Sequence, residues 1–166
     1  TIAFVHHGED LFFKDIYQGV QNILATERYQ PILIGSGGDP VGQAEKISWL
    51  LRQRWLTGIV LAPVNEKTGS RLVANVKQQG TPIVVVDFHV KNADVSVMSD
   101  NTQGGAYAAE ILREELTGES PILVFGSRNF YSLACRMNGF FENAKAYQWI
   151  LTEIFSPTDD IKEAKK

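Results

Sequence analysis

Four short, continuous apolar segments recur along the first half of the chain, and they constrain its fold more than any other feature. Each is rich in Val and Ile and does not alternate with polar residues, which is typical of strands buried on both faces of a parallel sheet. They read IAFV at 2–5, PILIG at 31–35, GIVLAP at 58–63 and PIVVVD at 82–87. Helical patterns separate them, so the sequence predicts βαβ units with right-handed crossovers and an α/β fold.

The segments between these strands carry apolar residues at helical spacing, and we expect helices over about 11–27, 40–54 and 67–79. Asp39 suits the N-cap of the second helix, and Pro40 suits its first position. With the strands, these helices predict a three-layer lobe in which a parallel sheet lies between two helical layers.

A second α/β lobe is expected to begin near residue 101. A short strand, VSVM at 95–98, is followed by SDNTQGG at 99–105. After it we expect a helix, a strand, a helix, a strand and the start of a third helix, at about 103–116, 121–126, 132–145, 148–155 and from Thr158. We therefore divide the chain into an N-terminal lobe, 1–100, and the beginning of a second lobe, 101–166.

Composition argues against several classes of function. The net charge is −3 and Lys165-Lys166 is the longest basic run, so this segment itself is not expected to grip nucleic acid. There is no apolar run of the length that spans a membrane, and no basic segment precedes the first strand as in a signal peptide. Cys135 is the only cysteine, which excludes an internal disulfide and a cysteine-based metal cluster.

The loop LIGSGGDP at 33–40 raises the possibility of a phosphate cradle, because glycine-rich loops after strands often bind phosphate. A dinucleotide fingerprint needs a third glycine where Pro40 stands, and it follows the first strand of a unit rather than the second. No Lys-Ser or Lys-Thr pair follows, so the loop is no P-loop either. We favour a turn that leads into a helix capped by Asp39.

Catalytic and metal-binding patterns are weak. His6-His7 follows the first strand and His89 the fourth, at spacings that match no known metal motif. No G-x-S-x-G elbow is present, and Cys135 lies in a helical pattern without a neighbouring His, as a buried or half-buried thiol would. We expect no enzyme activity, no metal and no cofactor.

Asp87 is the most informative polar residue. It ends an otherwise apolar strand, so its carboxylate is expected at the carboxyl edge of the sheet, either as a helix cap or as a ligand-binding group. Phe12 and Phe13 open the first helix at the same edge, just after Asp10. Aromatic rings beside a carboxylate suit a sugar, whose C–H face packs on rings while its hydroxyls donate to the carboxylate. Taken by itself, Phe13 suits a place in the core better than a ligand contact.

Six stretches together are identified as those of a known family: IAFV…DLFFKDIYQGVQNIL, GGDP…Q, TGIVLAP, GTPIVVVD, VMSDNTQGG and RMNGF. In this order and spacing they resemble the effector-binding domain of LacI/GalR-type transcription regulators. That domain is similar to the periplasmic sugar-binding proteins. The resemblance covers nearly the whole chain, about 2–166.

The resemblance implies a periplasmic-binding-protein-like fold of type I, with two α/β lobes and a small ligand between them. It implies that Asp10, Phe12 and Phe13 line the ligand cleft. By the same resemblance, Asp87 binds sugar hydroxyls, Arg136 reaches the ligand from the second lobe, and Asn101 lies at the crossover between lobes. The family also implies a homodimer that binds DNA through a helix-turn-helix that this chain lacks. The exposed-looking Trp49 and Trp55 are dimer candidates, or are partly buried against neighbouring helices.

This sequence departs from the family pattern at several points. Asp10-Leu11 stands where the family commonly has Asn-Pro, and Phe88 stands where an arginine often follows the acidic residue. A less hydroxylated or more aromatic ligand would suit these changes. The remaining part of the second lobe and the return to the first are expected to be missing.

Three functions are weighed. We favour the sugar-sensing domain of a cytoplasmic regulator, with allosteric control of DNA binding. The alternative is a periplasmic sugar-binding protein that serves an ABC transporter. A nucleotide-dependent enzyme is the third and least supported.

Overall fold

A computed structural model describes residues 1–8, 11–116, 118–128 and 130–155, of which the side chain of Phe155 is left aside. The chain divides into two compact units, Thr1–Met98 and Ser99–Lys166. The two units are described separately below.

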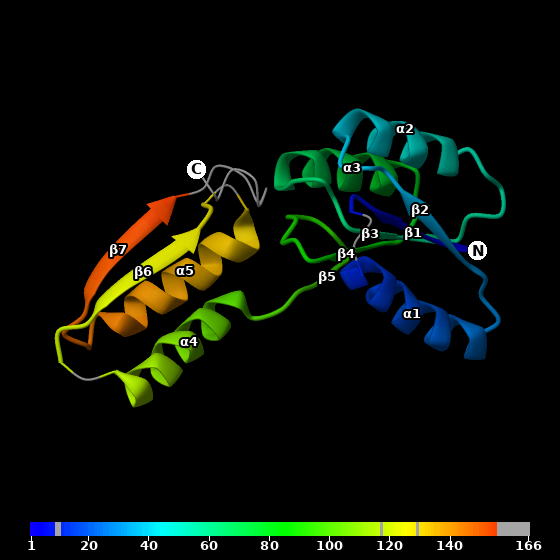
Figure 1. The fold of residues 1–166 in the computed structure, drawn as a ribbon. Coiled ribbons are helices and arrows are strands. Elements are labelled where there is room, and N and C mark those ends of the chain that lie inside the picture. Colours follow the sequence, from blue (N-terminus) through cyan, green and yellow to red (C-terminus); the bar gives the residue numbers. More distant parts are fainter. Residues whose placement is uncertain (9–10, 117, 129, 156–166) are drawn as a thin grey trace. The chain divides into compact units, whose positions relative to one another are not determined.

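The first unit contains a five-stranded, all-parallel sheet in the order β2-β1-β3-β4-β5 (Figure 1). Its strands are β1 (Ile2–His6), β2 (Pro31–Gly35), β3 (Gly58–Leu61), β4 (Ile83–Val86) and β5 (Val95–Val97). The helices that connect the first four strands are α1 (Leu11–Thr26), α2 (Pro40–Leu50) and α3 (Glu66–Gln78). The predicted parallel α/β fold is therefore confirmed.

The sheet lies between two helical layers, with α1 on one side and α2 and α3 on the other (Figure 1). Because successive strand residues face opposite ways, β1 contributes to both layers. Ala3 and Val5 pack in the core with Ile47 of α2 and Val73 of α3, whereas Phe4 packs on the other side with Phe13 of α1. The expected three-layer arrangement is thus present.

Two details of the first unit differ from the prediction. Helix α2 ends at Leu50 rather than near residue 54, and the chain then turns. Strand β2 is an edge strand, and Leu33 is 39% exposed, so this apolar run is not buried on both faces. A continuous apolar pattern does not distinguish an edge strand from a central one, because that difference depends on the strand order.

The LIGSGGDP loop forms a turn between β2 and α2. Gly37 and Gly38 have positive φ angles of 61° and 75°, a backbone region that glycine enters without steric cost. The Asp39 carboxylate accepts hydrogen bonds from the backbone N–H groups of Val41 at 3.0 Å and Gly42 at 2.8 Å. The predicted N-cap, with Pro40 at the helix start, is confirmed.

The second unit, over its described residues, contains two parallel strands and two helices. In chain order they are α4 (Asn101–Glu115), β6 (Pro121–Gly126), α5 (Tyr131–Ala144) and β7 (Ile150–Phe155). Both helices lie on the same side of the two strands (Figure 1). The core on that side combines Ala109, Phe140 and Ala144 with Ile122 and Val124 of β6.

Strand β6 is covered on one face only. Leu123 is 60% exposed and Phe125 63% exposed. Neither side chain belongs to the core that β6 forms with α4 and α5. Among the described residues of this unit, both helices lie on one side of the two strands (Figure 1). Residues 121–125 of β6 are all apolar. The sequence therefore does not show which face of this strand is covered.

Helices α4 and α5 approach each other through glycines. A Cβ atom added to Gly105 would lie 1.9 Å from the backbone oxygen of Arg136, and one added to Gly139 would lie 1.9 Å from that of Thr102. Such separations are impossible for real atoms, so the helix pair requires glycine at both positions. This contact fixes how the N-terminal part of α4 packs against the middle of α5.

The helix expected to begin near Thr158 lies outside the described residues, as does Asp10. Among the helices that the structure describes, none combines the length and the apolar character needed to cross a membrane.

Candidate functional site

A cluster of aromatic rings lies at the carboxyl edge of the sheet in the first unit. It consists of His6 and His7 at and after the end of β1, Phe12 and Phe13 in the first turn of α1, and Phe88 just after β4. We call these five residues the ring cluster. The His7 ring meets Phe13 edge-on with centroids 4.8 Å apart and Phe88 edge-on at 6.2 Å. Carboxyl ends of parallel strands are where open α/β sheets bind ligands.

Phe12 and Phe13 differ in their surroundings. Phe13 is buried in the core with Phe4, while Phe12 is 49% exposed and packs edge-on against Phe13 with centroids 5.2 Å apart. Of the two, Phe12 therefore offers the surface available for an external molecule. Phe13 is a core residue on which Phe12 packs, as expected for a side chain that belongs to the core.

Asp87 has an unusual backbone conformation directly after β4. Its φ angle is +64°, in the left-handed region that costs a non-glycine residue free energy. The backbone N–H of Asp87 donates to the carbonyl of Val97 at 2.9 Å, which ties this residue to β5. The sequence places an acidic residue here, but it gives no sign of the left-handed turn.

Gln43 holds the carboxyl ends of three strands together, although it lies on a helix. It is 0% exposed, and its Nε2 group donates to Ala62 O at 3.0 Å and to Ser36 Oγ at 3.3 Å. The backbone N–H of Val64 donates to Gln43 Oε1 at 3.1 Å. The Ser36 hydroxyl in turn donates to the backbone carbonyl of His6 at 3.0 Å.

Gln43 is the last residue of the GGDP…Q motif, but the sequence alone did not predict a role for it. A signal exists, because Gln43 lies four residues before Ile47 and seven before Leu50, on the buried face of α2. A buried amide needs hydrogen-bond partners, and strand ends supply them. The network thus fixes the backbone beneath the ring cluster.

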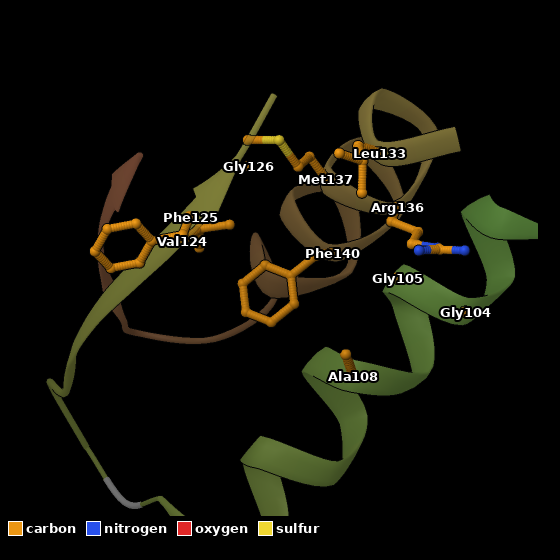
Figure 2. Close-up of a pocket in the computed structure, with 10 residues that line it drawn as sticks. All are labelled: Gly104, Gly105, Ala108, Val124, Phe125, Gly126, Leu133, Arg136, Met137 and Phe140. Atoms are coloured by element: carbon orange, nitrogen blue, oxygen red, sulfur yellow. The ribbon is translucent and has the colours of Figure 1, made fainter. Parts of the chain in front are cut away.

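In the second unit, Arg136 and Asn101 interact directly. The Arg136 Nε group donates to Asn101 Oδ1 at 2.7 Å, and Asn101 Nδ2 donates to Ser99 O at 3.2 Å. Asn101 is 5% exposed, so both ends of its amide are used within this unit. Figure 2 shows the Arg136 side chain reaching from α5 toward Gly104 and Gly105 at the start of α4.

A second arginine, Arg128, lies after the end of β6 and was not predicted. Its Nε and Nη2 groups donate to the two oxygens of Glu153 at 2.7 and 2.8 Å, and its Nη1 donates to Asn138 Oδ1 at 2.9 Å. The hydrogen bond from Arg128 lowers the pKa of Glu153, and the same bond raises the pKa of Arg128. No sequence motif links these residues, since 25 positions separate the pair.

A cavity of about 240 Å³ lies between α4, α5 and β6 (Figure 2). Its lining is mostly apolar, with Val124, Met137 and Phe140 on its walls and Arg136 as its charged residue. Met137 packs against Gly126, where an added Cβ would lie 2.2 Å from the methionine sulfur. The cavity therefore combines an apolar surface with one guanidinium group.

Within the described residues, no group of His, Cys, Asp and Glu side chains is arranged to hold a metal ion. Cys135 is half-buried, which agrees with the expected half-buried thiol.

The two units thus have the parallel α/β architecture of periplasmic-binding-protein-like domains of type I. The family model described as "Periplasmic binding protein domain" matches residues 2–165. The chain belongs to this family. The fold class expected from the sequence is confirmed.

Individual relatives agree with this assignment. The chain is 26% identical over 136 residues to the sucrose operon repressor of Pediococcus pentosaceus, covering 82% of the chain and 39% of the repressor. The crystal structure of a periplasmic ribose ABC transporter from Conexibacter woesei matches with a TM-score of 0.85 at 15% identity, covering 93% of this chain and 54% of that chain. That of a putative ribose operon repressor from Burkholderia thailandensis matches with a TM-score of 0.74 at 20% identity, covering 91% and 57%.

The resemblance to LacI-type effector-binding domains is confirmed by the family match together with the two repressors. The chain spans between 39% and 57% of the length of these three proteins. The two solved structures share the fold of this chain.

Proposed function

We propose that this chain is the sugar-sensing part of a LacI-type transcription regulator and that it acts by binding rather than by catalysis. The observation that carries the proposal is the ring cluster beside Asp87 at the carboxyl edge of the first sheet. Exposed and half-buried rings suit the C–H face of a sugar, and a carboxylate accepts hydrogen bonds from its hydroxyls. The relatives named for sucrose and ribose support the same class of ligand.

In the first unit, Phe12 and Asp87 are the proposed ligand contacts. Phe12 is about half exposed, and its ring packs edge-on against the buried ring of Phe13. The left-handed conformation of Asp87 supports a functional role, because strained residues gather at binding sites. Asp10 stays a proposed contact from the resemblance alone, as it lies outside the described residues.

In the second unit, Arg136 is the proposed ligand contact and Asn101 acts on it. The bond from Arg136 Nε to Asn101 leaves the two terminal nitrogens of the guanidinium for other acceptors. A sugar hydroxyl is a suitable acceptor for them. Asn101 would then fix the direction in which the arginine presents these donors.

Two specific functions compete, and a relative found by sequence favours the regulator. The sucrose operon repressor matches over 82% of this chain. Transport is the alternative, since a ribose ABC transporter has the same fold. The coding sequence upstream of this chain is the test: a helix-turn-helix encoded there would support the regulator, and a signal peptide would support the exported binding protein.

DNA and a second copy of the chain are the proposed macromolecular partners. DNA would be bound through a module outside these residues, and the sugar would bias the domain between two states with different affinity for DNA. Trp49 and Trp55 are candidates for dimer contacts, being 46% and 42% exposed with ring centroids 6.0 Å apart. Sedimentation of the native chain and of a Trp49→Lys variant tests that role.

The proposed ligand class is tested by thermal shift with sucrose, D-ribose, other sugars and polyols, and nucleosides. A bound sugar raises Tm, since a ligand that binds only the folded state stabilises it. Asp87→Asn removes the charge and keeps a residue that tolerates the left-handed backbone, so it should retain the fold and lose the shift. Asp15→Asn, an exposed position on α1, is the matched control.

A sugar shift that is equal in the Asp87→Asn variant and in the native protein would remove Asp87 from the site. If neither sugars nor polyols change Tm while a nucleoside does, the ligand class itself is wrong.

A further inference from the structure

His6 is the most deeply buried polar member of the ring cluster. It ends β1, and 6% of it is exposed. Its imidazole stacks on Phe4 with centroids 5.8 Å apart and planes 16° from parallel, and it meets Phe13 at 5.6 Å. The ring is therefore held on two sides by apolar rings.

The Nδ1 atom of this imidazole is buried and has no hydrogen-bond partner among the residues that the structure describes. Buried polar atoms almost always have one, and leaving an atom without a partner costs free energy. The backbone carbonyl of His6, by contrast, accepts hydrogen bonds from both the N–H and the hydroxyl of Ser36 at 2.9 and 3.0 Å. The unpaired atom thus lies in a residue whose backbone is firmly fixed.

The position of His6 suggests what supplies the missing partner. It lies at the carboxyl end of β1, beside the first turn of α1 that carries Phe12 and Phe13. This edge is the proposed sugar site, so the inference rests on the proposed function. Because Nδ1 is buried, a hydrogen bond from a ligand to this atom requires the neighbouring rings to shift; Phe12 is the most exposed ring of the cluster.

We propose that His6 determines the specificity of the site by forming a hydrogen bond between Nδ1 and a hydroxyl group of the ligand. A neutral imidazole nitrogen is either a donor or an acceptor, depending on the tautomer. A hydroxyl can pair with both forms, whereas a carboxylate can only accept and an ammonium group can only donate. The flanking rings of Phe4 and Phe13 favour an uncharged group. His6 therefore selects a neutral, hydroxylated ligand.

The proposal predicts opposite effects on stability and on binding. In a His6→Phe variant the ring stays and the unpaired nitrogen disappears, so the Tm of the unliganded protein is unchanged or higher. The same change removes the ligand hydrogen bond, so the affinity for a sugar falls by about tenfold. A purely structural histidine, for example one paired with a buried water, gives the reverse: a lower Tm and an unchanged affinity.

The experiment measures Tm and sugar affinity of the native chain, His6→Phe and His6→Asn, with sucrose and D-ribose as probes. His6→Asn restores a polar atom close to the place of Nδ1, and it should recover part of the affinity if the larger Phe disturbs the fold. Tyr29→Phe, which removes one polar group from an exposed ring before β2, is the control and should change neither quantity.

Each outcome is decisive. A higher or equal Tm with weakened sugar binding in His6→Phe supports the inference. Equal binding by the native chain and by His6→Phe overturns it, although the proposed function stands. A Tm of His6→Phe below the native value also overturns the proposed role of His6. If neither sugar binds the native chain, the proposed function fails for these two sugars.

Discussion

The Arg136 side chain donates from Nε to Asn101 Oδ1 at 2.7 Å, and this bond joins the first turn of α4 to the middle of α5. Asn101 is buried and also donates to Ser99 O. One amide thus fixes both the arginine and the backbone just before α4.

Asn101→Ala should therefore destabilise the protein by about 1–3 kcal/mol, because the guanidinium of Arg136 loses its partner and the carbonyl of Ser99 loses one of its two donors. Urea unfolding measures the change. Gln103→Ala, on the exposed side of the same turn, should fall within about 0.5 kcal/mol of the native value. Similar losses in both variants would contradict the special role of Asn101.

Gln43→Ala should be more damaging, because it leaves Ala62 O and the N–H of Val64 without their partners inside the core. We expect a loss of about 2–4 kcal/mol in the free energy of unfolding. Gln53→Ala, which removes one bond to Trp49 O near the surface, is the control. A loss below about 1 kcal/mol for Gln43→Ala would show that the strand ends do not depend on it.

Gly105→Ala and Gly104→Ala form a matched pair on α4. The first places a methyl group against the backbone of α5 and should cost several kcal/mol or prevent folding of the second unit. The second meets nothing within 4 Å and should stabilise the helix by about 0.5–1 kcal/mol. Circular dichroism during thermal unfolding compares the two, and an equal effect would mean that the helices can separate freely.

Asp87→Gly and Asp87→Ala separate backbone strain from chemistry. At φ +64° glycine is unstrained whereas alanine is not, so the glycine variant should be more stable than the alanine variant by about 1 kcal/mol. Both variants lose the carboxylate and should lose sugar binding alike. Chemical denaturation measures the difference, and equal stabilities would indicate that the turn relaxes.

The Glu153–Arg128 pair should make the stability of the second unit sensitive to acid. Because the folded state lowers the pKa of Glu153, through the hydrogen bond from Arg128, its contribution is complete above the ordinary pKa of the carboxyl. The contribution disappears as pH falls through the lowered value.

The Tm difference between the native protein and Glu153→Gln should therefore be present at neutral pH and shrink below about pH 4. It should be small, since the side chains are 43% and 31% exposed. Glu114→Gln, at an exposed position on α4, is the control and should show no such change with pH. A difference that persists in acid would indicate a role other than ion pairing.

The fold of the first unit could be predicted because its signals are local. Val- and Ile-rich strands, helical spacing and the Asp39-Pro40 helix start each lie within a few residues. The strand order could not be read from periodicity, and for that reason the exposed Leu33 on β2 was unexpected. The exposure of Phe125 on β6 has a different cause, because both described helices of the second unit lie on one side of its strands.

Long-range polar contacts account for what the sequence did not predict about the candidate site. Gln43 binds groups 7, 19 and 21 positions away, and Arg128 pairs with a residue 25 positions away. The left-handed backbone of Asp87 could not be predicted from the sequence either, because no glycine stands at this position to indicate a positive φ angle. The chemistry of single residues could be proposed from type and position, whereas their partners required the folded chain.

The close approach of α4 and α5 limits how this protein can vary. When a large residue replaces a small one in a core, a smaller neighbour can often restore the space. Gly105 and Gly139 each face the main chain of the opposite helix, and a main chain cannot be made smaller by substitution. Neither glycine can therefore be rescued by a second mutation in its partner helix, and related sequences that keep this helix pair should vary around these two positions but not at them.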